Sequence, residues 1–450
     1  MRLRPHDTSS EGGRSSERYR RIAFTSAAAL GSRVVGMAAN LVTVPLTFRY
    51  LGPERYGLWM VITSIIAMMA FADLGIGNGV VNSVAEAYGT GDRKLAREYV
   101  ASAFALLLGI AVILAALGAM AYPHISWQKV FNVKSPTVAS EGAAAFLVLF
   151  VWFIVNLPLS VINRAQTGLQ QAYLANVVST GGNILSLISV LIAIEFRCGL
   201  PLLVFASTFG SIAAVFFNGW LLFREHPWLF PSSHSYRGNL ALKVFKLGMM
   251  FFVLQCAVAV SYTSDNVVIS QVLGVAAVAA YAVPQKLFSV VATLVAMGVG
   301  PMWPAYGEAI ARGDSAWVLR AFQRSIRLVF LAVVPACTFL VVFGPWIVRM
   351  AMSKSLHVPM SVFIVLGLWS ILSAALTPIA LFLNGAGIMK QQMALAIITS
   401  VVNLGLSIFM TRRFGVIGVC LGSLITQLLI TVPAYVIIIK SVSRKLSMPQ

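Results

Sequence analysis

Charged side chains are scarce in this sequence, and their scarcity excludes a soluble globular protein. They make up 10% of the 450 residues, whereas a soluble domain usually carries about 25%. Hydrophobic residues make up 59% of the chain, and long apolar runs recur along its whole length. Because so few charges cannot cover a water-facing surface, we predict an integral membrane protein.

The sequence features of several enzyme classes are also absent. No P-loop motif is present, and the five histidines show no metal-ligand spacing. The four cysteines are dispersed and form no CxxC pair, so we interpret them as packing residues. No soluble catalytic domain interrupts the apolar runs. We therefore expect no enzyme, no cofactor and no metal site.

Acidic residues are rarer than basic ones, at 14 against 33, which gives a net charge of +19. Nucleic acid is not the expected partner, because the basic residues lie in short loops and not on one face. With the N-terminus inside, 22 basic residues fall in cytoplasmic segments and 9 in outside loops. This excess predicts a multi-pass protein of the inner (plasma) membrane with both termini in the cytoplasm.

Twelve apolar stretches are candidates for transmembrane helices, since a core of about 30 Å needs about 20 helical residues. The expected spans are 22–48, 57–81, 100–122, 143–162, 174–194, 200–223, 247–272, 276–302, 328–343, 362–383, 393–410 and 416–439. The predicted fold class is therefore an all-α integral membrane protein of about 12 transmembrane helices.

An internal repeat divides these spans into two halves. Gly52 before the second span matches Gly274 before the eighth, and Gly91 matches Gly313, both at an offset of 222 residues. A third match, at an offset of 221, pairs Asn163 and Gln170-Gln171 with Asn384 and Gln391-Gln392. Because each half has six spans, both halves cross the membrane in the same orientation. We expect two pseudo-symmetric halves around a central cavity.

The predicted domain organisation follows from the spans and the repeat. Residues 1–21 hold six arginines with Ser and Gly and no cleavable signal, so we expect a disordered cytoplasmic tail. An N-terminal six-helix half at 22–223, a cytoplasmic linker at 224–246, a C-terminal six-helix half at 247–439 and a cytoplasmic tail at 440–450 complete the chain.

A polar stripe runs along the first span. Gly36, Asn40, Thr43 and Thr47 follow Arg33 at spacings that place all five on one helical face. Such a stripe is expected to face a cavity or another helix.

The repeat carries this stripe into the seventh span. At an offset of 222, Arg33 maps to Gln255, Asn40 to Tyr262 and Thr43 to Asp265. Arg33, Asn40, Gln255 and Tyr262 are therefore candidate substrate-binding residues, and Lys286 in the eighth span is the fifth.

Ionisable residues within spans each cost about 2.5–3.5 kcal/mol at mid-membrane, which disfavours contact with lipid. In one interpretation, Arg33 and Lys286 attract an anionic headgroup such as pyrophosphate. In the other, each is neutralised by an Asp of a neighbouring helix and holds helices together. Both interpretations remain open from the sequence.

Two acidic residues are candidates for ion coupling or gating. Asp73 stands before three alternating glycines, Gly75, Gly77 and Gly79, which indicate a loosened helix. It is either a gate residue paired with a basic loop residue or a packing anchor. Asp265 is either a site that binds and releases a proton or cation, or the partner of Arg33 or Lys286.

Two stretches near the N-terminus resemble a known family. Residues 48–59, FRYLGPERYGLW, resemble the opening of polysaccharide-biosynthesis flippases, and residues 71–79, FADLGIGNG, with Ala85-Glu86 and Gly91-Asp92, strengthen the resemblance. The family is the O-antigen translocase type within the multidrug, oligosaccharidyl-lipid and polysaccharide exporter superfamily. The resemblance is sharpest over residues 20–120.

The resemblance implies two six-helix halves that rock in alternating access. The implied cargo is an oligosaccharide on an undecaprenyl pyrophosphate carrier, moved from the cytoplasmic to the periplasmic leaflet with ion coupling, in surface polysaccharide biosynthesis. Membrane lipid and a polysaccharide polymerase are the implied further partners. Arg33 and Lys286 match the cationic cavity that the resemblance implies.

Two further readings compete with a flippase. A cation-coupled multidrug or metabolite antiporter of the same superfamily would favour acidic residues deep in the cavity. A membrane-embedded glycosyltransferase or polymerase would carry a large outside loop, but the longest here are about 15–20 residues, at 123–142 and 344–361.

Overall fold

The computed structural model describes residues 10–131, 135–351 and 358–447, apart from a few side chains within helices. Over these residues the chain is helical and contains no strand. Eleven of the described helices are long and apolar enough to cross a membrane. These features confirm the predicted all-α membrane fold. The chain divides into two compact units, one up to Met249 and the other from Met250.

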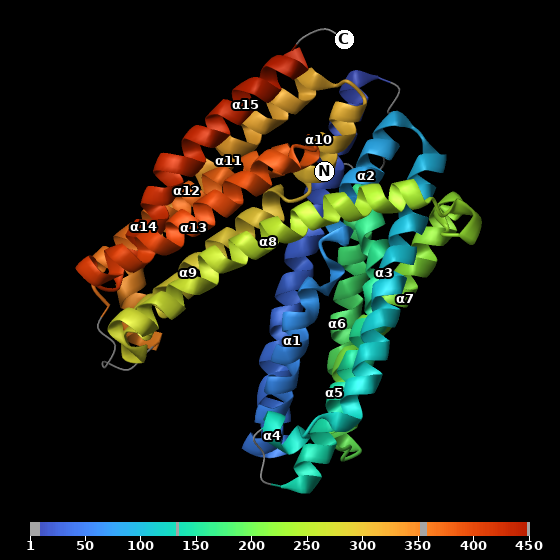
Figure 1. The fold of residues 1–450 in the computed structure, drawn as a ribbon, viewed down its shortest axis with the longest axis vertical. Helices are drawn as coiled ribbons and strands as arrows, with labels where there is room; N and C mark the ends of the chain where they lie inside the picture. Colours follow the sequence, from blue (N-terminus) through green and yellow to red (C-terminus); the bar gives the residue numbers. More distant parts are fainter. Residues whose placement is uncertain (1–9, 132–134, 352–357, 448–450) are drawn as a thin grey trace. The chain divides into compact units, whose positions relative to one another are not determined.

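The first unit is built from long helices that run side by side (Figure 1). Its helices are α1 (Glu11–Met68), η1 (Met69–Asp73), α2 (Ile76–Thr90), α3 (Arg93–Ala121), η2 (Tyr122–His124), α4 (Trp127–Phe131), α5 (Pro136–Gly168), α6 (Ala172–Glu195), α7 (Leu200–Glu225), η3 (Pro227–Leu229) and η4 (Ser233–Ser235). Helix α8 (Gly238–Leu273) begins in this unit and ends in the next.

The second unit repeats this plan. Its helices are α9 (Val275–Val299), α10 (Met302–Ala311), α11 (Ser315–Ala351), α12 (Met360–Gly385), α13 (Met389–Phe414), α14 (Ile417–Thr426), the π-helical turn η5 (Gln427–Thr431) and α15 (Val432–Ser447). Helix α12 packs on α9, α10, α11 and α14, and α13 packs on α14.

Small residues let the helices of the first unit approach closely, as is usual inside a membrane. A Cβ added at Gly182 of α6 would lie 2.7 Å from the backbone oxygen of Gly210 in α7, and one added at Gly210 would overlap the Gly182 oxygen. A Cβ at Gly168 would lie 2.8 Å from Val84 of α2. These contacts bring α6 and α7, and α2 and α5, to backbone contact.

The two matches at an offset of 222 are equivalent in the structure. Gly52 and Gly274 both have positive φ, at 74° and 92°, and each interrupts the helical path before the next helix. Gly91 and Gly313 have φ of 76° and 78° just after α2 and α10. Positive φ is nearly free for glycine and strained for other residues, which explains why glycine occurs at both sites of each pair.

The third match is out of structural register. Helix α5 ends at Gly168 and α12 at Gly385, and α6 and α13 begin at Ala172 and Met389, so the equivalent residues here are 217 apart. The sequence match at 221 is therefore displaced by about one helical turn, because the second unit is five residues shorter before this point. The register of 217 pairs Trp152 with Trp369.

The second expected span, 57–81, is not one helix. Helix α1 continues to Met68, a 3₁₀ turn follows, and Leu74 and Gly75 have φ of 48° and 67° before α2 begins. Two left-handed residues in sequence end the helix. This break explains why eleven long helices are found in the described chain where twelve spans were expected.

The N-terminal tail also differs from the expectation of disorder. Residues 11–21 are helical and form the first turns of α1. Glu17 accepts hydrogen bonds from Arg20 Nε at 2.7 Å and from Arg21 Nε at 3.0 Å. These pairs, three and four residues apart, support helix where composition alone suggested a tail.

Candidate functional site

The polar stripe of α1 lines a cavity inside the first unit. The cavity has a volume of about 460 Å³ and lies between α1, α5, α6 and α7. Gly36, Asn40, Thr43 and Thr47 all line it. A Cβ at Gly36 would lie 3.2 Å from Asn183 Nδ2, so this glycine leaves room for the amide. The cavity has no charged side chain among its lining residues, and Arg33 is not one of them.

A second polar cavity lies inside the second unit. Its volume is about 230 Å³, and α8, α12, α13, α14, η5 and α15 line it. Trp369 lies in its wall as Trp152 lies in the wall of the first cavity. Its lining residues include no charged side chain. Each unit thus holds a neutral, polar cavity beside an equivalent tryptophan.

The two predicted cations lie outside these cavities. Arg33 on α1 and Lys286 on α9 are exposed. Within the described part of its own unit, neither side chain makes an ion pair or hydrogen bond. Arg33 follows Arg21 by 12 residues and Lys286 precedes Val299 by 13, which corresponds to about 18 Å and about 20 Å along the helix. Both therefore lie well inside an apolar helical stretch.

Asp265 is buried in the second unit, with a relative exposure of 2%. One carboxylate oxygen accepts a hydrogen bond of 2.6 Å from the Tyr281 hydroxyl. The other oxygen, Oδ1, has no hydrogen-bond partner among the described residues. Lys286, in the same unit, does not pair with it. The carboxyl group is therefore held by one side chain and has one oxygen left for a proton or cation.

The remaining predicted residues of α8 are less informative. Gln255 is half-buried, and it does not line the cavity of its unit. The side chain of Tyr262 lies outside the described residues. The structure therefore brings Asn40 into a cavity and Asp265 to Tyr281, and it leaves Arg33 and Lys286 exposed.

Asp73 lies at the break between α1 and α2. Its Oδ1 accepts a hydrogen bond of 3.0 Å from the Gly75 backbone N–H. A Cβ added at Gly77 would lie 3.2 Å from Asp73 Oδ2 and 2.8 Å from Arg164 Nε. Arg164 in turn donates to Asn78 Oδ1 at 2.9 Å. This cluster favours the packing interpretation of Asp73.

Arg164 was missed by the sequence analysis. It falls just after the expected fourth span, where it counted as one of the cytoplasmic loop residues, but α5 extends to Gly168. The only signal in the sequence was the need of Asp73 for a basic partner. Packing of α5 on α2 brings Arg164 close to Asp73, since a Cβ added at Gly77 would meet both side chains.

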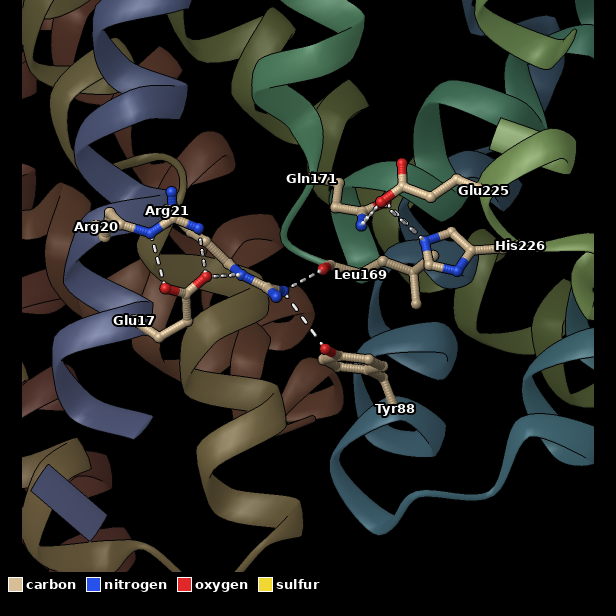
Figure 2. Close-up of polar contacts among 8 residues, drawn as sticks. All are labelled: Glu17, Arg20, Arg21, Tyr88, Leu169, Gln171, Glu225 and His226. Carbon is tan, nitrogen blue, oxygen red and sulfur yellow. Dashed lines mark hydrogen bonds and ion pairs between the residues drawn. The ribbon is translucent and has the colours of Figure 1, made fainter. Parts of the chain in front are cut away.

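A polar network ties together the helix ends of the first unit (Figure 2). Arg21 of α1 donates to Glu17, to the Leu169 carbonyl at 3.2 Å and to the Tyr88 hydroxyl at 3.4 Å. It thereby links the start of α1 to the end of α2 and to the turn after α5. Arg21 was counted only as a tail residue by the sequence analysis.

The same figure shows a second group, between α6 and α7 (Figure 2). Gln171 donates to Glu225 Oε1 at 3.2 Å, and its Oε1 lies 3.1 Å from His226 Nε2. Burial lowers the pKa of His226, and the nearby cations Arg93 and Arg21 lower it further, while Glu225 opposes the shift. The imidazole is therefore held in its neutral form at neutral pH.

Comparison with known proteins identifies relatives along most of the chain. The family model described as polysaccharide biosynthesis protein matches residues 26–308, and the MatE model matches 251–409. A candidate O-antigen export protein of Yersinia pseudotuberculosis is 23% identical over 91% of this chain and 93% of its own length. A candidate O-antigen transporter of Salmonella typhi is 20% identical over 69% of this chain and 68% of its own length.

Solved structures share the fold. An outward-facing multidrug resistance MATE family transporter of the MOP superfamily matches with a TM-score of 0.80 at 15% identity, over 98% of this chain and 100% of that one. A MOP superfamily transporter from Pyrococcus furiosus matches over the same shares, with a TM-score of 0.77 at 14% identity.

The relatives agree with the expectation that the chain is not an enzyme, because they are named for export and transport. The polysaccharide biosynthesis model covers more than half of the chain, and its match includes both sequence stretches that carried the resemblance. The protein is therefore a multi-pass membrane protein of the polysaccharide biosynthesis protein family, with the fold of the MOP superfamily transporters.

Proposed function

We propose that this protein is a flippase for a lipid-linked oligosaccharide. Its cargo is a saccharide on an undecaprenyl pyrophosphate-type carrier, moved from the cytoplasmic to the periplasmic leaflet of the inner membrane for surface polysaccharide biosynthesis, such as that of O-antigen or exopolysaccharide. Two relatives named for O-antigen export and transport support this cargo class.

The observation that carries the proposal is the state of Arg33 and Lys286. Both are exposed, both lie well inside an apolar helical stretch, and neither side chain makes an ion pair or hydrogen bond within the described residues of its own unit. A cation in contact with lipid at this depth costs about 2.5–3.5 kcal/mol. An anionic pyrophosphate group would offset that cost, because Arg binds phosphate oxygens through its fork and Lys supplies a point charge.

The cavities supply the second requirement of the cargo. Sugar hydroxyls would lose their hydrogen bonds in hydrocarbon, which costs several kcal/mol for each unsatisfied group. Amides and hydroxyls in the two cavities can replace water around the saccharide. The isoprenoid tail stays in the bilayer while the two units alternate access.

Ion coupling is assigned in this proposal to Asp265. A buried carboxyl with one bonded and one unbonded oxygen can take up a proton or cation and release it. In the living cell, both termini lie in the cytoplasm, and the polysaccharide polymerase machinery receives the cargo outside.

A multidrug antiporter is the second candidate, because solved multidrug transporters share the fold. A site for cationic drugs would place carboxylates where the drug binds. The lining residues of the two cavities include none, and the exposed mid-span charges are positive. The charge pattern therefore favours an anionic cargo.

The test uses proteoliposomes that hold a fluorescent lipid-linked oligosaccharide. We expect the wild-type protein to flip it, and we expect Arg33→Ala and Lys286→Ala each to slow flipping at least about tenfold, because each removes one charge-assisted contact. Arg49→Ala is the matched control, since Arg49 is also an exposed arginine of α1. If the control and the two variants flip equally fast, the cationic site is wrong.

A further inference from the structure

The cavity of the second unit is unusual for the interior of a membrane protein. Its wall carries amide and hydroxyl side chains from five helical elements, among them Ser373, Thr399, Asn403, Thr426 and Gln427, beside the indole of Trp369. Polar groups in a membrane helix are costly unless they are paired or serve a site. The cavity is not sealed, because Trp369, Ser373 and Gln427 are only half-buried.

The backbone is irregular where it forms this wall. Residues Gln427–Thr431 form a π-helical turn between α14 and α15, and its first and last residues both line the cavity. Single π turns within α-helices are rare and occur frequently at functional sites. Here the turn presents Gln427 to Ser373 of α12, with the amide atoms 3.0 and 3.1 Å from the hydroxyl.

Comparison of the two units shows that two polar positions of this wall are specific to the second unit. In the register of 217, Gly182 and Gly210 of the first unit correspond to Thr399 and Gln427 of the second. The glycines close α6 against α7. Their counterparts line the cavity. The close approach of α13 to α14 lies elsewhere, where a Cβ at Gly422 would be 2.7 Å from Ser407 Oγ. At these two positions, a backbone contact in the first unit is thus replaced by polar lining residues in the second unit.

The polar side chains are held in place without a ligand. Asn403 donates to Ser423 Oγ at 3.1 Å and accepts from Ser407 Oγ at 2.9 Å. Gln427 is held by Ser373. Such a wall requires little reordering when a ligand binds, and a small ordering cost favours affinity.

The chemistry of the wall selects the ligand. Amides and hydroxyls both donate and accept hydrogen bonds, as sugar hydroxyls do. The indole offers an apolar face to the C–H face of a ring, and the lack of charged lining residues gives no preference to a phosphate. We propose that this cavity binds one neutral sugar ring of the cargo and thereby selects which saccharide is flipped. The inference rests on the proposed function, and it places sugar selection in the second unit.

The volume agrees with a single ring. A cavity of about 150 Å³ holds one benzene ring, so a cavity of about 230 Å³ has the size that one sugar ring needs. We therefore expect the cavity to bind one residue of the saccharide and to leave the others in the aqueous space.

The experiment compares Gln427→Leu with Gln391→Leu in proteoliposomes. Gln391 lies on α13, is exposed and does not line the cavity, so it is the matched control. We expect Gln427→Leu to raise KM for the lipid-linked oligosaccharide about fivefold or more, with little change in the maximal rate, because a hydrogen-bond pair to the sugar is lost. Gln391→Leu should retain the wild-type KM.

A binding measurement separates this inference from the proposed function. Free oligosaccharide, released from its lipid, is titrated into the detergent-solubilised protein, and tryptophan fluorescence is followed. We expect a saturable change in the wild type that is lost in Trp369→Phe and weakened at least about fivefold in Gln427→Leu. If Gln427→Leu does not fold, Ser373→Ala takes its place, since it removes the hydroxyl that holds Gln427.

Each outcome decides one proposal. If the wild type flips the lipid-linked cargo but KM and fluorescence are unchanged in Gln427→Leu, the cavity holds only water and the inference is wrong. If the wild type flips nothing yet binds free oligosaccharide through Trp369, the flippase proposal fails and the sugar site stands. If it neither flips the cargo nor binds the sugar, both fail.

Discussion

At the scale of single residues, Arg21 connects several parts of the first unit. Its guanidinium joins Glu17, Tyr88 and the Leu169 carbonyl, which belong to three separate segments (Figure 2). Bonds to a charged donor contribute about 1.5–3 kcal/mol each when partly shielded, and less where water competes. Arg21 therefore fixes the start of α1 against the end of α2 and the turn after α5.

We expect Arg21→Ala to lower the stability of the folded protein by about 1–3 kcal/mol, since it removes the donor to the Leu169 carbonyl and to the Tyr88 hydroxyl, and one of the donors to Glu17. Thermal unfolding in detergent measures the change as a fall in Tm. Lys94→Ala is the control, because Lys94 is exposed and makes no described contact in its unit. Equal Tm values for the two variants would contradict a stabilising role for Arg21.

His226 gives a prediction about pH. Burial holds its pKa below the ordinary value near 6.5. Between the two pKa values the unfolded chain binds more protons than the folded one, so stability falls as the pH falls. We expect Tm to drop when the pH is lowered from about 7.5 to about 5.5, and we expect His226→Gln to flatten this dependence. An unchanged slope in the variant would show that His226 is not the titrating group.

Asp265 is the residue on which ion coupling depends in our proposal. Asp265→Asn keeps the contact with Tyr281 possible but removes the titrating group. We expect the variant to lose acceleration of flipping by an imposed proton or sodium gradient, by about tenfold or more, while cargo still binds. Gradient-driven flipping in proteoliposomes measures this. A variant that responds to the gradient as the wild type does would remove Asp265 from the mechanism.

At the scale of elements, the break between α1 and α2 depends on the conformation of one glycine, Gly75. Gly75 has φ 67° and is followed directly by α2, where Gly77 makes room for Arg164. A residue with a Cβ in the left-handed region is strained by about 1–2 kcal/mol.

We therefore expect Gly75→Ala to destabilise the protein by about 1–2 kcal/mol. The control is Gly109→Ala in the middle of α3, where an added Cβ meets nothing within 4 Å. Helix propensity makes that change neutral or stabilising, by up to about 1 kcal/mol. Chemical unfolding followed by circular dichroism compares the two, and equal effects would show that the left-handed turn at Gly75 is not required.

The sequence predicted helices well and helix boundaries less well. Apolar runs and the 3.6-residue period of the α1 stripe are local signals, and they placed Gly36, Asn40 and Thr43 on a cavity wall. The break at Gly75 was visible only as a loosened helix, because glycine permits a left-handed turn without requiring one. The helical residues 11–21 were missed because composition indicated a tail, whereas pairs such as Glu17 and Arg21 decide the conformation.

Contacts between segments were harder to predict. Arg164 donates a hydrogen bond to Asn78, which is 86 residues away in the sequence, and no local sequence pattern predicts that contact. The third repeat match was out of structural register for a related reason. The second unit is five residues shorter before this point, and this difference in length shifts the helix ends relative to the matching residue types. The equivalence of Trp152 and Trp369 likewise follows only from the helix ends.

At the scale of the whole molecule, the neutral polar side chains and the mid-span cations of the two units lie in different places. Each unit holds a neutral polar cavity, each has an equivalent tryptophan in its wall, and the exposed mid-span cations lie outside both. A lipid-linked oligosaccharide has the matching parts, with neutral sugars joined to an anionic phosphate group. This correspondence between the parts of the cargo and the parts of the protein is the central claim.

One comparison tests that claim most directly. Wild-type protein in proteoliposomes is offered a fluorescent lipid-linked oligosaccharide and, separately, a fluorescent organic cation under a proton gradient. We expect the saccharide lipid to cross the bilayer at a rate well above that of protein-free vesicles, and we expect the cation not to move. Transport of the cation with no movement of the saccharide lipid would show that the protein is a multidrug antiporter and not a flippase.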